Sequence, residues 1–280
     1  MLPHPSLLVG LHVRVSGQSI NAWVNPAAIP GGYKDDRQLQ GYDSKPGDAQ
    51  LGYAVPNLLV EYAMRNTHVP VGPWRGVNTN QNAVYMECFM DELAEAAGQD
   101  PLAFRMKLLK PKWAAVLKAA CDKAGYGKPL PAGHFHGISQ VMGYGSYVAG
   151  VAEVSVSPEG VLKVHKITAA TDPGYVVNPA QVERQIAGSF VYGLSAALYG
   201  EITVKDGAVE QTNFDSYNVM RMDEMPKVES ALVPSGGFWG GVGEPTIAVA
   251  APAVLNGIYK ATGKRVRELP LMHQELKKGA

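Results

Sequence analysis

The stretch that decides the fold class is Val151-Ala-Glu-Val-Ser-Val-Ser-Pro-Glu-Gly-Val-Leu-Lys-Val-His-Lys-Ile167. On both sides of Ser157-Pro-Glu-Gly160, apolar and polar residues alternate with a period of two residues. The tetrapeptide itself is typical of a turn, so we predict a β-hairpin. A helix should then begin near Pro179. Its apolar residues recur at intervals of four, at Val182, Ile186, Phe190, Leu194 and Leu198. Paired strands followed by a long amphipathic helix indicate an α+β fold with mixed sheets and packed helices.

Outside this stretch the pattern changes between strands and helices. Strands are expected from Leu8 to Val15 and from Leu51 to Tyr62, on either side of turn-rich sequence at Pro30-Gly-Gly and Asp43 to Asp48. Three helices should follow, over Ala83 to Ala97, Asp100-Pro101 to Leu109 with Asp100 as N-cap, and Trp113 to Ala124. Towards the C-terminus we expect a hairpin at Lys205-Asp-Gly207, a strand from Lys227 to Val233 and a helix from Ile247 to Thr262.

The pattern also predicts two subdomains. The hydrophobic period shifts near residues 126–136, where glycine and proline are frequent. We therefore expect an α/β subdomain over residues 1–125, with the Trp74-Arg75 loop and the long helix. An α+β subdomain should span residues 126–280 and carry the segments around Gln185 and Glu244.

Composition limits the class of protein and of ligand. The 280 residues are 46% hydrophobic and 18% charged, as in a globular protein with a real core. Lys+Arg and Asp+Glu balance at 25 each, which argues against nucleic acid and favours a small molecule or a protein partner. Cys88 and Cys121 stand at apolar helix positions, which favours packing. No secretory signal or stretch of about 20 apolar residues occurs, so we expect a soluble or peripheral chain.

The first candidate for chemistry is Glu244, in Ser235-Gly-Gly-Phe-Trp-Gly-Gly-Val-Gly-Glu-Pro-Thr246. Glycines let a backbone approach a ligand closely, and here they lead directly into a helix. A carboxylate on such a loop is positioned by backbone geometry and can serve as a general acid or base. The alternative is an acid at a helix start, favoured by the macrodipole and next to a tight turn.

Two further segments carry candidate binding residues. Val71-Gly-Pro-Trp-Arg-Gly76 places Arg75 beside Trp74, where its planar fork could hold a phosphate or carboxylate, or form a surface ion pair. In Asn178-Pro…Gln185-Ile-Ala-Gly188, Asn178 should cap a helix and Gln185 should lie near its inward side. The amide of Gln185 suits the rim of a polar cofactor, although the residue chemistry alone favours a buried structural glutamine.

Other motifs do not support a site. Gly241-Val-Gly243 lacks the third glycine of a dinucleotide fingerprint, and Gly257 to Arg265 has the wrong spacing for a P-loop. His134-Phe-His136 has no cysteine or acid at ligand spacing, so we expect solvated loop residues there and no metal.

Taken in order, the candidate segments resemble the molybdenum-binding subunit of the xanthine dehydrogenase and aldehyde oxidoreductase family, in its isoquinoline 1-oxidoreductase beta-subunit branch. The matching stretches are Arg14-Val-Ser-Gly-Gln-Ser-Ile20, Gly72-Pro-Trp-Arg-Gly76, Asp91-Glu-Leu-Ala-Glu-Ala-Ala-Gly-Gln-Asp-Pro-Leu-Ala-Phe-Arg105, Val177-Asn-Pro…Gln185-Ile-Ala-Gly188, Phe190-Val-Tyr-Gly-Leu-Ser-Ala-Ala-Leu-Tyr199 and Gly241-Val-Gly-Glu-Pro245. The resemblance implies the C-terminal part of a molybdopterin-binding region.

The resemblance also implies roles for these residues. Glu244 matches the family's catalytic glutamate, the base in a hydroxylation of an aldehyde or aromatic N-heterocycle that takes its oxygen from water. Gln185 matches the glutamine that binds the molybdopterin-type molybdenum cofactor. The expected cofactor-binding residues are Gln185, Gly188, Trp74, Arg75, Gly76 and Gly243, with no metal ligand from this chain.

Two departures qualify the resemblance. The chain lacks the Gly-Gln-Gly motif that the resemblance implies for the family's first half, so we expect either a partner chain that supplies that half or a truncated or split gene product. Phe238-Trp239 is bulkier than the resemblance suggests, and Asp172-Pro173-Gly174 carries an unusual proline.

The resemblance further implies a small iron–sulfur subunit with the clusters and a cytochrome as a further partner. It favours a periplasmic or membrane-associated location. The alternative is a catalytically silent structural or assembly subunit; a stand-alone hydrolase using Glu244 lacks a nucleophile and is weaker.

Overall fold

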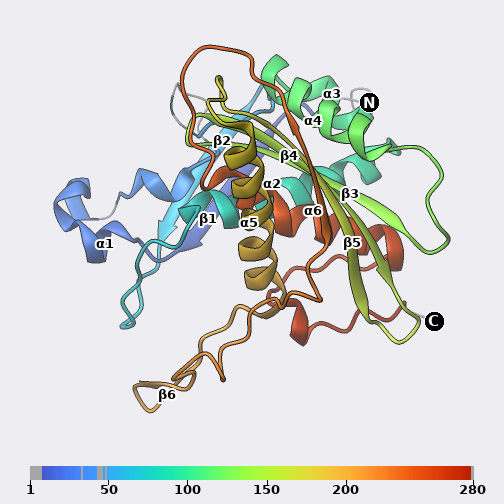
Figure 1. Ribbon diagram of the computed structural model, residues 1–280. Helices are drawn as coiled ribbons and strands as arrows, with labels where there is room; N and C mark the ends of the chain where they lie inside the picture. Colours follow the sequence, from blue (N-terminus) through green and yellow to red (C-terminus); the bar gives the residue numbers. More distant parts are fainter. Residues whose placement is uncertain (1–7, 33, 43–46, 48, 279–280) are drawn as a thin grey trace, which may run out of the picture.

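The centre of the molecule is a four-stranded mixed sheet. A computed structural model describes residues 8–32, 34–42, 47 and 49–278 (Figure 1). The strand order is β3-β4-β5-β8, and the strands are β3 (Phe135–Gly143), β4 (Ser146–Val156), β5 (Leu162–Asp172) and β8 (Lys227–Leu232). The first three strands are antiparallel and β8 is parallel to β5. The mixed α+β class predicted from the sequence is therefore confirmed.

Strands β4 and β5 are the predicted hairpin, and both extend beyond the predicted alternation. The predicted strand at Lys227 to Val233 is β8. Strand β3 was not predicted, because seven of its nine residues are buried and it shows no alternation of apolar and polar residues. When both faces of a strand are buried, its sequence lacks the alternation of apolar and polar residues by which strands are recognised.

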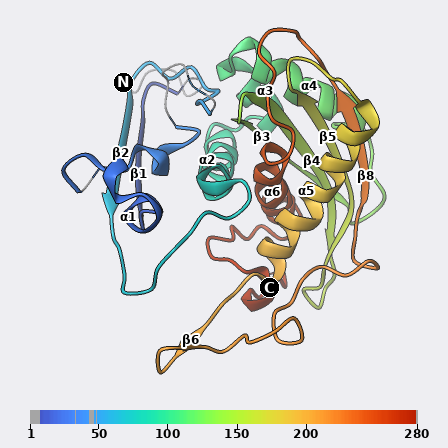
Figure 2. The ribbon, with the colours of Figure 1, turned by 60° about the vertical axis from the view of Figure 1, so that its left-hand side comes forward.

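Helices cover both faces of this sheet. On one face, α5 (Pro179–Tyr199) and α6 (Ala250–Thr262) pack against Val148, Ala152 and Ile167. On the other face, α4 (Pro111–Ala124) packs against Ala149, Val151 and Ala170. Helices α2 (Val77–Ala96) and α3 (Pro101–Leu108) lie beside the sheet, and α2 contacts α6 (Figure 2). No helix in the described part of the chain is long and apolar enough to cross a membrane.

The predicted helices are confirmed, with two differences in their bounds. Helix α2 begins at Val77 and not at Ala83. The predicted helix from Ile247 is a 3-10 turn, η4 (Pro245–Val249), followed by α6. Pro252 has no N–H to donate to the preceding turn, which explains why regular α-helix begins only at Ala250. The predicted caps are also confirmed, since Asp100 accepts from the N–H groups of Leu102 and Ala103, and Asn178 accepts from Gln181.

The N-terminal part forms a small lobe beside α2. Its strands β1 (Leu11–Gly17) and β2 (Leu58–Met64) form a parallel two-stranded sheet. Between them lie helix α1 (Asn21–Val24) and three 3-10 turns, η1 (Pro26–Ala28), η2 (Pro30–Gly32) and η3 (Asp36–Leu39). Of the predicted turn at Asp43 to Asp48, residues 43–46 and 48 lie outside the described residues. The first half of the predicted strand at Leu51 to Tyr62 is irregular apart from a bridge between Tyr53 and Leu109.

A thin arm extends from the body after α5. It carries the predicted hairpin, β6 (Val204–Lys205) and β7 (Ala208–Val209), which turns at Asp206 and Gly207 with positive φ angles (Figure 1). A last 3-10 turn, η5 (Leu271–His273), follows α6. Cys88 and Cys121 are free thiols within α2 and α4, as the packing interpretation predicted.

The sheet and a helix approach each other closely at Gly137 in β3. A Cβ added there would lie 2.1 Å from the Ala253 carbonyl oxygen and 2.2 Å from the Gly257 nitrogen, both in α6. We expect Gly137→Ala to lower the free energy of unfolding by about 1–3 kcal/mol, because backbone must move. Gly143→Ala, whose Cβ would meet only ordinary contacts at 3.5 Å and beyond, is the control. Equal midpoints for both variants in urea unfolding would contradict this close packing.

Candidate functional site

The segment 235–244, the glycine strap, is fixed to the sheet by its backbone. The N–H groups of Gly236 and Gly240 donate to the carbonyls of Gly174 and Pro173, each at 2.8 Å. The N–H of Gly241 donates to the Tyr144 carbonyl, also at 2.8 Å. The strap therefore lies on the loop after β5 and on the turn between β3 and β4.

Glycine is required at two of these contacts. A Cβ on Gly174, whose φ is +80°, would lie 2.1 Å from the Phe238 carbonyl oxygen. A Cβ on Gly240 would lie 2.3 Å from the Ser146 hydroxyl. The glycines thus let the strap lie directly on neighbouring backbone, which supports the predicted reason for their presence.

Glu244 ends the strap and is partly buried. It is the N-cap residue of η4, yet its carboxylate makes no capping bond. Instead its Oε1 accepts a hydrogen bond from the Gly76 N–H at 3.0 Å, across 168 residues of sequence. No hydrogen bond to Oε2 occurs in the described part of the chain. The carboxylate is therefore oriented by a second loop, and the simple helix-start interpretation does not account for it.

Arg75 joins this loop to the strap and to α5. Its Nε donates to the Gly243 carbonyl at 2.7 Å, and one terminal nitrogen donates to Gln185 Oε1 at 3.1 Å. The same nitrogen lies 3.4 Å from the Ser189 hydroxyl and also donates to the Gly243 carbonyl. The predicted alternative of a surface ion pair is wrong, because these partners are a carbonyl, an amide and a hydroxyl. The fork of Arg75 holds together three segments that the sequence analysis selected separately.

Aromatic residues border Arg75. The Trp74 ring stacks on Tyr192 of α5 with centroids 4.6 Å apart, and the guanidinium carbon of Arg75 lies 5.4 Å from the Tyr192 ring centre. The Arg75 carbonyl accepts from the Asn80 amide at 2.9 Å. Ser189, Tyr192 and Asn80 were missed by the sequence analysis. Ser189 and Tyr192 follow Gln185 by one and two helical turns, and that spacing was the available signal.

Gln185 and Gly188 lie on the exposed side of α5. The predicted alternative of a buried structural glutamine is therefore wrong, and Gln185 does not lie on the inward side of its helix. A Cβ on Gly188 or Gly243 would meet no heavy atom within 4 Å. Open space therefore lies next to bare backbone at Gly188 and at Gly243.

The two unusual features of the loops have structural explanations. The carbonyl of Pro173 accepts the Gly240 N–H, and Asp172 Oδ1 accepts the N–H groups of Gly174 and Ser235. Trp239 stacks on Tyr175 with centroids 4.9 Å apart. The Phe238 side chain is exposed. Asp172 and Pro173 thus help to fix the strap.

The prediction of solvated loop histidines is wrong for His136, whereas His134 does lie in the loop before β3 but is largely buried. His136 belongs to β3, and burial lowers its pKa. The ring of His134 stacks on His165 with centroids 3.9 Å apart, and its Nδ1 lies 2.7 Å from Glu153 Oε1. Within the described ranges no group of three or more His, Cys, Asp or Glu residues is arranged to hold a metal ion.

Comparisons with known proteins identify the family of this chain. One family model, described as a molybdopterin cofactor-binding domain, matches residues 75–226, and a second with the same description matches residues 31–109. The first model covers more than half of the chain. The chain belongs to the molybdopterin cofactor-binding domain family. Trp74 lies one residue before the first matched range and within the second, whereas Gly243 and Glu244 lie beyond both.

Two curated relatives show how much of a larger protein is present. The chain is 29% identical to the isoquinoline 1-oxidoreductase subunit beta of Brevundimonas diminuta, over 79% of this chain and 29% of that protein. It is 30% identical to a membrane-bound aldehyde dehydrogenase of Gluconacetobacter polyoxogenes, over 86% of this chain and 35% of that protein. The name of the latter specifies pyrroloquinoline quinone, whereas the family models specify molybdopterin. The chain spans about a third of the length of these relatives.

A solved structure shows the same fold. The aldehyde oxidoreductase of Desulfovibrio desulfuricans superposes with a TM-score of 0.68 at 16% identity, over 86% of this chain and 44% of that one. A molybdopterin cofactor-binding domain needs a surface where a large polar group can approach backbone. The open space at Gly188 and Gly243 and the exposed amide of Gln185 fit such a group.

The Arg75 fork should control how firmly the strap is held. We expect Arg75→Lys to speed hydrogen exchange of the Gly76 amide about tenfold or more, because a lysine cannot bond to Gly243 and Gln185 in one plane. The Gly240 amide, bonded to Pro173, is the internal control and should keep its rate. Exchange can be followed by NMR at constant pH. Unchanged exchange at Gly76 would show that Arg75 does not hold the loop against Glu244.

Proposed function

We propose that the chain is part of a molybdenum-dependent oxidoreductase that hydroxylates an aldehyde or aromatic N-heterocycle with water as the oxygen source. The observation that carries this proposal is the convergence of Glu244, Arg75 and Gln185 on one surface of a molybdopterin cofactor-binding domain. The names of the relatives, an isoquinoline oxidoreductase and an aldehyde dehydrogenase, support the two substrate classes.

In this proposal Glu244 is the general base. Its Oε1 is fixed by the Gly76 N–H, so the carboxylate can present Oε2 to a water-derived oxygen and accept its proton. Loss of that proton lets the oxygen add to the electron-poor carbon of the substrate. One C–O bond forms and one C–H bond breaks. The molybdopterin cofactor, when bound, would take up the hydrogen of that C–H bond together with its bonding electron pair, which is the two-electron oxidation of the carbon.

The other residues of the site orient the base and the cofactor. Gln185 offers an amide on the exposed side of α5. The backbone is accessible at Gly188 and Gly243, where an added Cβ would meet no atom within 4 Å. Arg75 keeps the strap against α5. The rest of the cofactor's contacts and the substrate pocket would come from a partner chain, and electrons would leave through iron–sulfur clusters of a small subunit and then a cytochrome.

Filling the open space at Gly188 tests the cofactor surface. We expect Gly188→Leu to remove most molybdenum and pterin from the complex that co-purifies with the chain, because the new side chain occupies the space that the cofactor would use. The fold should be retained, since glycine is a poor residue within a helix and a Cβ at position 188 meets no atom.

Ala180→Leu, at an exposed position in the first turn of α5, is the matched control and should keep the cofactor. Molybdenum is measured by mass spectrometry of the metal and pterin by fluorescence after oxidation. A full complement of cofactor in Gly188→Leu would place the cofactor elsewhere. Metal absent from every complex of the unmodified chain would instead favour the silent structural subunit.

A further inference from the structure

The N-terminal sheet has an open edge. The Leu11 N–H donates to the Asn57 carbonyl at 2.8 Å, and the Arg65 N–H donates to the Gly17 carbonyl at 2.9 Å. Odd-numbered residues of β1 therefore direct their backbone groups to β2, and His12, Arg14 and Ser16 direct theirs away. No hydrogen bond joins the backbone groups of these three residues to any other residue that the structure describes. Two-stranded sheets are marginal alone, and parallel strands usually lie within larger sheets.

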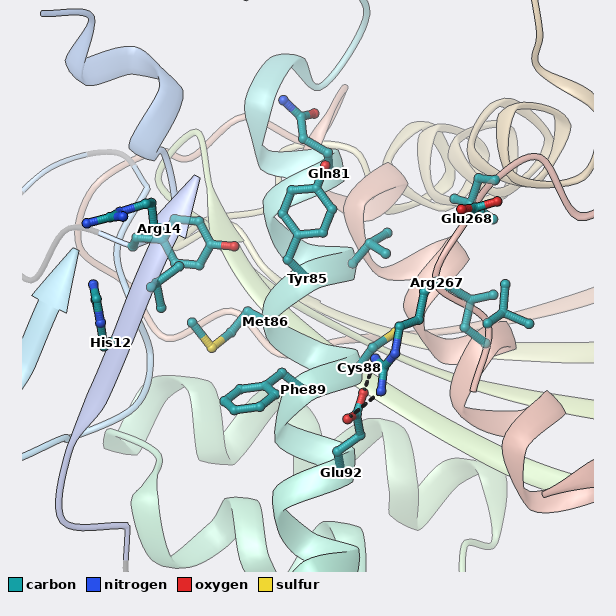
Figure 3. A pocket seen from close by; sticks show the side chains of 16 residues that line it. His12, Arg14, Gln81, Tyr85, Met86, Cys88, Phe89, Glu92, Arg267 and Glu268 are labelled. Carbon is teal, nitrogen blue, oxygen red and sulfur yellow. Dashed lines mark hydrogen bonds and ion pairs between the residues drawn. The ribbon is translucent and has the colours of Figure 1, made fainter. Parts of the chain in front are cut away.

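A cavity of 630 Å³ runs beside this edge. In Figure 3, His12 and Arg14 of β1 lie on one side of α2, and Arg267 and Glu268 lie on the other, with Tyr85 and Phe89 between them. The floor is apolar and includes Val84, Tyr85, Cys88, Phe89, Leu255 and Val266. Tyr85 is 54% exposed and Phe89 is 42% exposed. Two large aromatic side chains one helical turn apart thus face solvent.

A second hollow, of 260 Å³, continues the first towards the candidate site. Both hollows are lined by Gln81 and Tyr85, and the second also reaches Ser16 and Trp74. Together they form a trough, lined along one side by residues 12–18 of the N-terminal lobe. It ends at Trp74, and the next two residues, Arg75 and Gly76, donate hydrogen bonds to Gly243 and Glu244 respectively. An occupant of the trough would therefore lie next to the site of the proposed reaction.

Of the charged side chains that line the trough in the described part of the chain, all except the exposed Glu268 have partners. Arg267 binds both oxygens of Glu92, at 2.6 and 2.9 Å. Arg14 and His12 bind Glu61 on β2, at 2.9 and 2.5 Å. What remains available is an apolar floor, a row of backbone donors and acceptors, and the single carboxylate of Glu268 at the rim. Such a surface selects an extended backbone with alternating apolar side chains, and it offers little to a charged small molecule.

We propose that the trough binds an extended segment of a partner polypeptide, which adds to β1 as a third strand and lays alternate apolar side chains on Tyr85 and Phe89. The partner is the polypeptide that forms the part of the enzyme subunit that this chain does not cover. The chain covers only 29% and 35% of the two curated relatives, so those proteins contain the additional polypeptide that this role requires. The inference rests on the proposed membership in a larger enzyme subunit, and it is independent of the role of Glu244.

Synthetic peptides provide the test. Overlapping peptides of roughly ten residues, the usual upper length of a strand, are made from the part of the Brevundimonas subunit that this chain does not match. Their binding to the full chain is measured by fluorescence anisotropy and by amide exchange. We expect one segment to bind and to protect the amides of His12, Arg14 and Ser16, while those of Val13 and Val15 stay as they were.

Two variants locate the binding surface. Phe89→Asp should weaken binding of that peptide about tenfold or more, and Phe214→Asp, which changes an 82% exposed phenylalanine on the β6–β7 arm, should not. Circular dichroism verifies that both variants are folded. Binding by no peptide, protection away from β1, or equal weakening by both variants would overturn the proposal. A chain that dimerises through this edge, and becomes monomeric with Phe89→Asp, would assign the trough to a second copy and would equally overturn it.

The peptide measurements need no turnover and no cofactor. If no peptide binds, the proposed role of Glu244 still stands. If a Glu244→Gln variant keeps wild-type turnover, the proposed role of the trough still stands. The two proposals can therefore be rejected separately.

Discussion

Glu244→Gln is expected to lower the turnover of the assembled, cofactor-loaded enzyme by about 10²–10⁴-fold, the range that a positioned general base contributes. Glutamine has the same shape, and its amide oxygen can still accept the Gly76 N–H that now binds Oε1. The strap and its bond to Arg75 should therefore stay in place. What the variant loses is a group that can accept a proton, so the rate of the chemical step falls while substrate binding changes little.

The measurement is a comparison of turnover and molybdenum content in the same preparations. Glu210→Gln, an exposed carboxylate on the β6–β7 arm, is the control and should leave both unchanged. Wild-type turnover in Glu244→Gln, with full metal content, would remove Glu244 from the catalytic step and favour the silent subunit. Loss of metal together with turnover would show that the carboxylate serves cofactor binding instead.

The sequence predicted three residues that the structure brings together, but it predicted neither their contacts nor the neighbouring Ser189, Tyr192 and Asn80. Glu244, Arg75 and Gln185 were each selected from local chemistry and from a family resemblance. The bonds that bring them together span 110 residues from Arg75 to Gln185 and 168 from Gly76 to Glu244. Such distances depend on how α5 and the strap pack on the sheet, which no local pattern encodes. For the same reason Arg75 was expected to bind an anion, and its carbonyl and amide partners were not foreseen.

The errors in the fold also have local physical causes. Helices with one apolar face and defined caps, such as α4 and α5, were predicted well because their period and their Asn or Gly signals agree. Strand β3 was missed because burial on both faces removes alternation. His136, which lies in this strand, was therefore assigned to a loop. Correct prediction of His134 required its stacking partner His165, which the strand pairing brings close.

A second large effect is expected from the buried ion pair between α2 and α3. Arg105 and Glu87 are almost fully inaccessible, and Arg105 Nε lies 3.1 Å from Glu87 Oε2. Glu87 also accepts hydrogen bonds from the Tyr53 hydroxyl at 2.6 Å and from the Gln140 side chain and backbone N–H at 2.9 and 3.1 Å. This carboxylate therefore connects α2, α3 and β3. Arg105→Met should lower the free energy of unfolding by about 3–5 kcal/mol, because it leaves a buried charge without its partner.

The same variant should make stability depend on pH. Burial raises the pKa of Glu87 above its ordinary value, and Arg105 opposes that rise. Without Arg105 the pKa of Glu87 in the folded chain rises further. When the pKa of a carboxyl is higher in the folded state than in the unfolded state, its protonation stabilises the folded state. This stabilisation is complete below the pKa of the unfolded state and is lost as the pH rises through the pKa of the folded state. Urea unfolding of Arg105→Met should therefore show stability falling from mildly acidic to neutral pH, more steeply than in the unmodified chain.

A second substitution separates the charge from the packing. Arg105→Met combined with Glu87→Gln removes the buried charge and keeps the hydrogen bonds that Oε1 accepts from the Tyr53 hydroxyl and the Gln140 side chain, but loses the bond that Oε2 accepts from the Gln140 backbone N–H. The double variant should recover part of the lost stability and lose the added pH dependence, since glutamine does not titrate in this range. Arg221→Met, at an exposed position, is the control for loss of an arginine. If the double variant is no more stable than Arg105→Met at neutral pH, the loss comes from the cavity and not from the uncompensated carboxylate.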